Sequence, residues 1–155
     1  MENCPMIRTK RLQIRLASDS EMRELIDRTD DPDLRLAYTE MFTLAKEHPD
    51  QRAWYGIWKI LLSDTETEIG DLCFKGLVDG TTEIGYGIDP AFQRNGYATE
   101  AVTAMTHWAL SQTDVKRIEA ETDPENRASQ RVLEKAGFLP TGTMGEEGPR
   151  FFFPG

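Results

Sequence analysis

One stretch decides the fold of this 155-residue chain: Tyr86-Gly-Ile-Asp-Pro-Ala-Phe-Gln-Arg-Asn-Gly-Tyr-Ala-Thr-Glu100. It predicts a strand, a short turn, a glycine-bearing loop and then a helix. A loop in front of a helix directs unpaired backbone N–H groups, and the positive end of the helix dipole, at one point. Such a point is an anion site, and phosphate is its usual occupant. The spacing Gln93-x-x-Gly96-x-Ala98 is neither a Walker loop nor a dinucleotide fingerprint, because both need more glycines at other offsets.

A second segment strengthens this interpretation: Asp123-Pro-Glu-Asn-Arg-Ala-Ser-Gln-Arg-Val-Leu-Glu-Lys-Ala-Gly-Phe138. It combines an Asn126-x-x-Ser129 helix start with a Gly-Phe pair at the helix end. Together, the two segments resemble the GNAT family of N-acetyltransferases, and most of all its RimJ/RimL-type ribosomal-protein branch. The resemblance extends to the amino-acid sequence over residues 83–138. Over residues 8–82 it is limited to the order of the predicted elements.

Periodicity places elements along the whole chain and shows no repeat or linker. Ser18-x-x-Glu21 is a capping box that begins a first helix, and Asp31-Pro32 ends that helix. The further helices are predicted over 33–47, 98–110 and 126–136, and the strands over 12–16, 54–62, 68–74, 83–88, 116–122, 139–144 and 149–153. These patterns alone indicate a mixed α/β fold with a mostly antiparallel sheet. The resemblance implies one GNAT domain over residues 1–155, a three-layer α/β (α+β) fold with about seven strands and about four flanking helices.

Composition narrows the class of protein. Hydrophobic residues make up 39% and charged residues 29%, as in soluble globular domains. The net charge of −9 argues against nucleic-acid binding, which uses clustered Lys and Arg. It is compatible with a cationic substrate, and also with a surface that only maintains solubility. No apolar run approaches the roughly 20 residues of a membrane span, no signal region is evident, and Cys4 and Cys73 form no disulfide or zinc pattern. We therefore expect a cytoplasmic protein that needs no metal.

The resemblance implies that acetyl-CoA is the cosubstrate. A bulge in strand 83–88 would open a gap for the pantetheine arm, and a backbone N–H there would polarise the thioester carbonyl. The residues expected to contact the cosubstrate are Tyr86, Gly87, Ile88, Gln93, Arg94, Asn95, Gly96, Tyr97, Ala98, Thr99, Asn126 and Ser129. Three alternatives stay open: a plain strand that tolerates its glycines, an N-cap role for Asn126, and a surface position for Ser129. Glu100, in the first turn of its helix, is expected to be structural.

Acetyl transfer to an amine requires a neutral nucleophile. A lysine-like amine with a pKa of about 10.4 is neutral in only roughly one molecule in 2,500 at pH 7. An α-amine with a pKa near 8 is neutral far more often, so it depends less on a base. The candidate base is Glu83, because family members carry a carboxylate at this place; the alternative is a solvated charge at a strand edge. Many family members have a proton-donating tyrosine where this chain has Leu133. The acid is then absent, supplied elsewhere, or unnecessary for a thiolate with a pKa near 8.5.

The sequence and the resemblance together predict an N-acetyltransferase that uses a ternary complex, without a covalent intermediate. The acceptor would be a small-molecule or peptide amine, bound by residues of about 28–56 and the terminal hairpin. Lining candidates are Tyr38, Glu40, Trp54 and Tyr55, with core packing as the favoured explanation for Trp54. A homodimer is compatible with the family. Two other classes remain open: a non-catalytic acyl-CoA-binding sensor or interaction module, and an unrelated phosphate binder.

Overall fold

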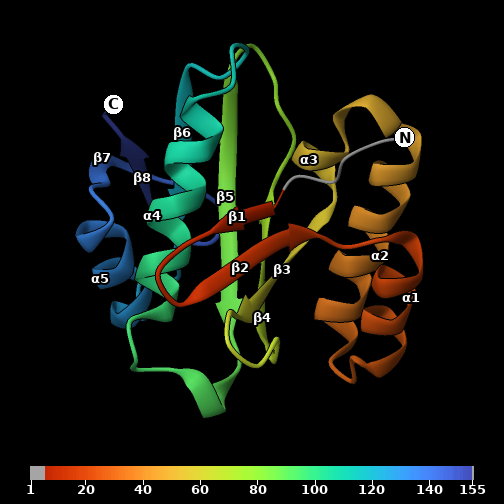
Figure 1. Ribbon diagram of the computed structural model, residues 1–155. Helices are drawn as coiled ribbons and strands as arrows, with labels where there is room; N and C mark the ends of the chain where they lie inside the picture. Colours follow the sequence, from red (N-terminus) through yellow and green to blue (C-terminus); the bar gives the residue numbers. More distant parts are fainter. Residues whose placement is uncertain (1–5, 155) are drawn as a thin grey trace.

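The computed structural model describes residues 6–154, and one eight-stranded sheet forms its middle layer (Figure 1). The spatial order of the strands is β1-β2-β3-β4-β5-β6-β8-β7. All neighbours are antiparallel except β5 and β6, which run parallel. The strand bounds are β1 Met6–Arg8, β2 Leu12–Leu16, β3 Ile57–Leu62, β4 Glu68–Phe74, β5 Thr81–Ile88, β6 Arg117–Glu121, β7 Leu139–Met144 and β8 Pro149–Phe153.

Helices cover both faces of the sheet, so the predicted mixed α/β fold is confirmed. On one face lie α1 (Asp19–Arg28) and α2 (Pro32–Glu47), and on the other lie α4 (Tyr97–Leu110) and α5 (Arg127–Lys135) (Figure 1). The one-turn helix α3 (Arg52–Tyr55) leads into β3. None of the helices within residues 6–154 is long and apolar enough to cross a bilayer.

Two details of the prediction were wrong. The sheet has eight strands rather than about seven, because the three-residue β1 is too short to show a period-two pattern. The predicted strand 54–62 begins only at Ile57, because the residues before it form α3, a fifth α-helix. The Gly56 N–H closes that helical turn on the Arg52 carbonyl at 2.8 Å. Trp54 and Tyr55 have high β-propensity but also fit a helical turn, so their residue types wrongly predicted a strand here. Cys4 and the N-terminal segment lie outside the described residues.

The alternation of side chains along β4 explains the two cores. Leu72 and Phe74 point toward α4, into the larger cluster of buried residues. Asp71 and Cys73 point to the opposite face, where Met22 and Tyr38 form a smaller cluster with neighbours from β3 and α2. The α4 face therefore supplies most of the buried apolar area, and the α1–α2 face is the more polar of the two.

The predicted helix boundaries are set by their caps. Ser18 and Glu21 form the capping box, with each side chain accepting from the other's backbone N–H. Arg15 donates to the Glu21 carboxylate, and this bond, with further donors, holds the pKa of Glu21 far below its ordinary value although burial opposes the shift. At the end of α5, Gly137 has a φ of +100°, and the buried Phe138 follows it as predicted.

Candidate functional site

The sheet opens between β5 and β6. The two strands pair only from Thr81 to Glu83, and β5 then continues to Ile88 along β4 alone. The register with β4 is continuous from Ile84 to Ile88, so the expected bulge in the β4–β5 ladder is absent from this stretch. The gap arises because β6 diverges from β5. Within residues 6–154, no strand pairs with the exposed edge of β5.

The backbone of β5 presents alternate residues to this gap. The Lys75 N–H donates to the Glu83 carbonyl, and the Asp89 N–H donates to the Ile69 carbonyl, both toward β4. Antiparallel pairing therefore turns the N–H and C=O of Tyr86 and Ile88 the other way, into the gap. The Ile88 carbonyl accepts from the Gln93 side chain at 2.8 Å. Within residues 6–154, no hydrogen bond occupies the backbone groups of Tyr86 or the Ile88 N–H on this side.

The loop after β5 places free N–H groups at the start of α4. Gly96 is the N-cap residue with a φ of +81°, and no side chain caps this helix. Among the described residues, none accepts a hydrogen bond from the N–H of Tyr97, Ala98 or Thr99. Asn95 braces the loop by donating to the Phe92 and Gln93 carbonyls, at 3.2 Å each. Free N–H groups that converge at the start of a helix favour an anion.

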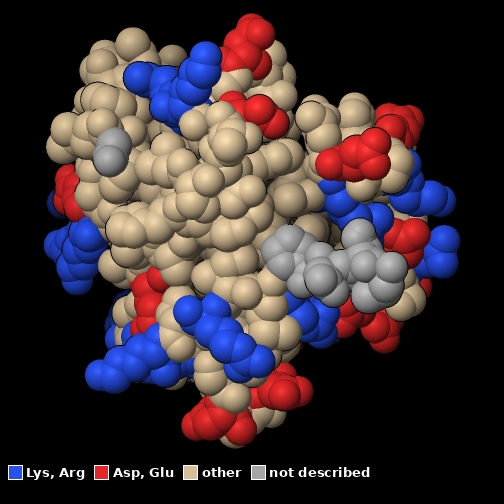
Figure 2. All heavy atoms as spheres, turned by 45° about the horizontal axis from the view of Figure 1, so that its top comes forward, with Lys and Arg blue, Asp and Glu red and all other residues tan. Residues whose placement is uncertain are grey.

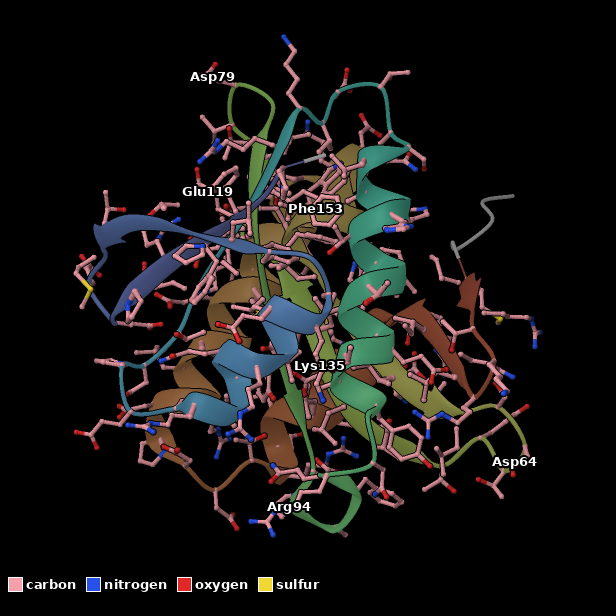
Figure 3. The ribbon with its side chains drawn as sticks, turned by 90° about the vertical axis from the view of Figure 1, so that its left-hand side faces the viewer. Asp64, Asp79, Arg94, Glu119, Lys135 and Phe153 are labelled. Carbon is pink, nitrogen blue, oxygen red and sulfur yellow. The ribbon has the colours of Figure 1, made fainter. Side chains whose placement is uncertain are left out.

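Positive charge reaches this loop from two parts of the chain. Arg94, with a φ of +68°, lies at the tip of the loop, at the opposite end of β5 from Asp79 (Figure 3). Arg11, in the β1–β2 turn, lies 4.4 Å over the Tyr97 ring. Its guanidinium also lies 3.4 Å from the position that a Cβ on Gly96 would take. Arg11 was not among the residues predicted for this loop, because no local pattern signals a contact across 85 residues of chain.

Glu100 has the structural role that was expected. Its carboxylate accepts from the Thr9 hydroxyl, from the Arg11 N–H at 2.9 Å and from the Arg11 side chain at 2.7 Å. Burial alone would raise the pKa of Glu100, but these hydrogen bonds lower it. The carboxylate thus attaches the β1–β2 hairpin to the first turn of α4.

We expect Glu100→Gln to lower the free energy of unfolding by about 1 kcal/mol at pH 7. Because the pKa of Glu100 is lower in the folded protein, its stabilisation is present above the unfolded value and is lost as the pH falls. The difference between variant and parent should therefore be smaller at about pH 3 than at pH 7. Urea unfolding at both pH values measures it, with the exposed Glu24→Gln as a matched control. An equal loss at both pH values would contradict this role of the charge.

The two predicted motifs meet across the gap. Asn126 caps α5 by accepting from the Ser129 N–H at 3.0 Å, so the N-cap alternative is part of its role. The Tyr86 hydroxyl lies 2.7 Å from the Ser129 hydroxyl, which rules out a plain surface position for that serine. Burial raises the pKa of Tyr86, so it stays protonated at neutral pH. Leu133, one turn further along α5, is buried in the core.

Glu83 lies where the strands part. Its carboxylate pairs with Lys75 and with Arg150, at 3.2 Å each. Arg150, on β8, also contacts Glu119 and Glu121 of β6. Glu83 is therefore a member of an ion network and not a lone solvated charge. The alternation Arg-Ile-Glu-Ala-Glu over β6 could have indicated that Glu119 and Glu121 share one face of a strand. No comparable pattern in the sequence indicated that Arg150 joins this network.

A cavity of about 390 Å³ lies between the α1–α2 turn and the ends of β4 and β5. Of the four candidates for an acceptor pocket, Tyr38 lines this cavity, and Glu40, Trp54 and Tyr55 do not. Trp54 packs into the core against Phe74, and Tyr55 stacks on His48, with ring centroids 4.1 Å apart. The lining residues are Leu25, Arg28, Thr29, Asp30, Asp31, Leu34, Tyr38, Glu68, Gly70, Asp71 and Asp89.

A family model for the acetyltransferase (GNAT) domain matches residues 9–139. The chain belongs to the GNAT acetyltransferase family. The resemblance carried by the two motifs is thereby confirmed. On the face of this GNAT chain seen in Figure 2, the middle is free of charged residues, and Lys, Arg, Asp and Glu lie around its margin.

Relatives in sequence cover part of the GNAT chain. The uncharacterized N-acetyltransferase YjdG of Bacillus subtilis (strain 168) is 38% identical over 84 residues, which are 53% of this chain and 50% of that protein. The probable N-acetyltransferase YjcK of the same organism is 45% identical over 62 residues, 40% of this chain and 34% of that protein. In these matches, the chain spans about half or less of the curated relatives' length.

Solved structures share the fold over nearly the whole chain. The acetyltransferase from Agrobacterium tumefaciens str. C58 has a TM-score of 0.78 at 20% identity, covering 100% of this chain and 97% of that one. RimL, a ribosomal L7/L12 alpha-N-protein acetyltransferase solved in complex with coenzyme A, has a TM-score of 0.74 at 19% identity, covering 96% of each chain. The fold is therefore that of GNAT structures, including members of the expected branch.

Proposed function

We propose that this GNAT protein transfers an acetyl group from acetyl-CoA to a primary amine by direct attack in a ternary complex. One observation carries the proposal: the uncapped start of α4 adjoins the gap between β5 and β6. The free N–H groups of Tyr97, Ala98 and Thr99, with Arg94 and Arg11, would bind phosphate. The Tyr86 backbone and the Ile88 N–H would bind the pantetheine arm in the gap.

The residues around the gap suit the chemistry of acyl transfer. The amine nitrogen attacks the thioester carbonyl carbon, a C–N bond forms, the C–S bond breaks, and a thiolate leaves. The Tyr86 N–H, directed into the gap, would stabilise the developing negative charge on the carbonyl oxygen. The paired hydroxyls of Tyr86 and Ser129 would supply a hydrogen-bond donor to the thiolate, in place of a phenol at Leu133. Gly87, whose backbone faces β4, would contribute only space.

Glu83 is the proposed proton acceptor for the attacking amine. It lies at the point where β5 and β6 part, on the strand that borders the gap. A substrate ammonium would displace Lys75 or Arg150 from the Glu83 carboxylate. The side-chain nitrogens of both residues lie 3.2 Å from a carboxylate oxygen of Glu83. The same two pairs favour a second candidate function. A carboxylate held by two cations, with Leu133 in the core, also suits an acyl-CoA-binding module without turnover.

Glu83→Gln separates the two candidates. For a lysine-like amine we expect kcat to fall about 100-fold, since removing a general base typically costs that much or more. An α-amine, which is more often neutral at pH 7, should lose less. Acetyl-CoA affinity, measured by calorimetric titration, should stay within about twofold. Thiol release over a panel of amines gives the rates.

Glu119→Gln is the matched control, because it removes another carboxylate from Arg150 and leaves Glu83 in place. Similar turnover in Glu83→Gln and the parent would rule out Glu83 as the base. Tight acetyl-CoA binding by the parent, with no thiol release for any amine, would favour the non-catalytic module. A phosphate binder of another class would show no preference for acetyl-CoA over free nucleotide phosphates.

A further inference from the structure

The face of the sheet under α1 and α2 carries a buried pair of polar groups outside the transfer chemistry described above. The Tyr38 hydroxyl, on α2, donates to the Asp71 carboxylate on β4 at 2.7 Å. Tyr38 is 7% exposed, so packing fixes its ring and thereby the carboxylate it contacts. Both residues line the 390 Å³ cavity under the α1–α2 turn. The pair therefore presents a positioned negative charge to an accessible space.

Among the described residues that line the cavity, carboxylates outnumber cations by five to one. Arg28 is the one Lys or Arg among the described lining residues, and it donates to Glu68 at 2.6 Å. The side chains of Asp30 and Asp89 make no hydrogen bond or ion pair with any residue of 6–154. Burial raises the pKa of Asp71 to about 6, so its carboxyl is still mostly ionised at neutral pH. Such a cavity favours a cation and disfavours the polyanionic cosubstrate.

The position of the cavity relates it to the proposed base. Asp71 pairs with Gly87 across the β4–β5 ladder, and a Cβ on Gly87 would meet no atom within 4 Å. The space beside Asp71 is therefore open toward β5. Glu83 lies four residues before Gly87 on the same strand, so their side-chain positions share one face of the sheet, about 13 Å apart.

We propose that the cavity at Asp71 binds a second positive charge of the acceptor, about 13 Å from the amine that reacts beside Glu83. This inference rests on the proposed function and makes Asp71 a specificity-determining residue. The ligand chemistry is a primary amine joined by a flexible chain to another cation. A long polyamine supplies it, and so does a peptide whose N-terminus is followed, a few residues later, by lysine. A short diamine cannot reach both carboxylates.

Amines of matched length test this inference in the full chain. We compare decylamine, decanediamine and butanediamine as acceptors, with thiol release as the readout. The parent should prefer decanediamine to decylamine by about tenfold in kcat/KM, which corresponds to about 1.4 kcal/mol. Butanediamine should show no such gain. Two tetrapeptides that differ only by lysine or norleucine at the fourth position form the peptide arm, and they distinguish the two sources of the chemistry.

Asp71→Asn removes the charge and keeps an acceptor for the Tyr38 hydroxyl. It should abolish the preference for decanediamine through a higher KM for that acceptor. Tyr38→Phe, which keeps the charge but frees the carboxylate, should lower the preference by roughly threefold. The matched control is Asp79→Asn, at an exposed turn at the other end of β5 (Figure 3).

The outcomes separate this inference from the function on which it rests. A parent that turns over decylamine and decanediamine equally well would overturn the inference and leave the acetyltransferase intact. The same holds if Asp71→Asn keeps the full preference for the diamine. Loss of acetyl-CoA binding by the parent, or of turnover with every amine, would remove the proposed function and the inference with it. Far-UV circular dichroism checks the folding of each variant, and Tyr38→Phe provides the test if Asp71→Asn does not fold.

Discussion

Gly96→Glu is expected to abolish acetyl-CoA binding, with a loss of affinity of about 100-fold or more. Two causes add. Gly96 has a φ of +81°, which strains any residue with a side chain, so the loop would shift and its N–H groups would no longer converge. A carboxylate at the start of α4 would also occupy the anion site and repel the phosphates. Calorimetric titration of parent and variant measures the effect directly.

Gly142→Glu is the matched control for this substitution. Gly142 has a similar φ of +84°, it lies on β7 with open space around its Cβ position, and it is far from the loop in sequence. It therefore carries the same backbone strain and the same added charge without the anion site, and its affinity for acetyl-CoA should match the parent's. Micromolar binding retained by folded Gly96→Glu would rule out this loop as the cosubstrate site.

Trp58→Ala should lower the free energy of unfolding by about 4 kcal/mol, a large part of the stability of a typical domain. Trp58 is fully buried on β3, and its indole N–H donates to the Ala53 carbonyl at 3.0 Å. Its ring meets Trp108 of α4 edge-on, with centroids 5.0 Å apart. Truncation would leave a cavity between the sheet and α4 and an unpaired carbonyl beside it.

Urea unfolding followed by far-UV circular dichroism measures this loss without relying on tryptophan fluorescence. Leu36→Ala is the control, because Leu36 on α2 is 60% exposed and its truncation should change stability by no more than about 0.5 kcal/mol. A loss below about 1.5 kcal/mol for Trp58→Ala would mean that the site relaxes around the missing ring. So small a loss would contradict the expectation that the Trp58 ring is needed for the packing of β3 against α4.

Local signals predicted most of the fold. The capping box at Ser18, the glycine at 137 and the helical spacing of apolar residues in α4 are properties of neighbouring residues, and the structure confirms each of them. The errors arose where local pattern is weak. The three residues of β1 are too few to show a period, and Trp54 and Tyr55 carry strand propensity but form a helical turn.

The site was predictable only in its sequential parts. The loop from Gln93 to Thr99 appears in one stretch of sequence, and its geometry agrees with the anion site that was expected. The partners that complete the site come from distant segments. Arg11 reaches the loop from the first hairpin, Arg150 reaches Glu83 from the last one, and Tyr38 reaches Asp71 from α2. Contacts of this kind depend on the strand order of the sheet, which no local period encodes.

The parting of β5 from β6 divides the sheet into two unequal blocks, β1–β5 and β6-β8-β7, joined in the sheet by three parallel residue pairs. Tyr86 and Glu83 belong to the first block, whereas Ser129 follows β6 along the chain and Arg150 belongs to the second block. The seam is thus also the place where the proposed reaction would occur. The alignment of the catalytic groups then depends on how the blocks are held together, so a change that tilts one block against the other would impair the chemistry without touching any residue of the site.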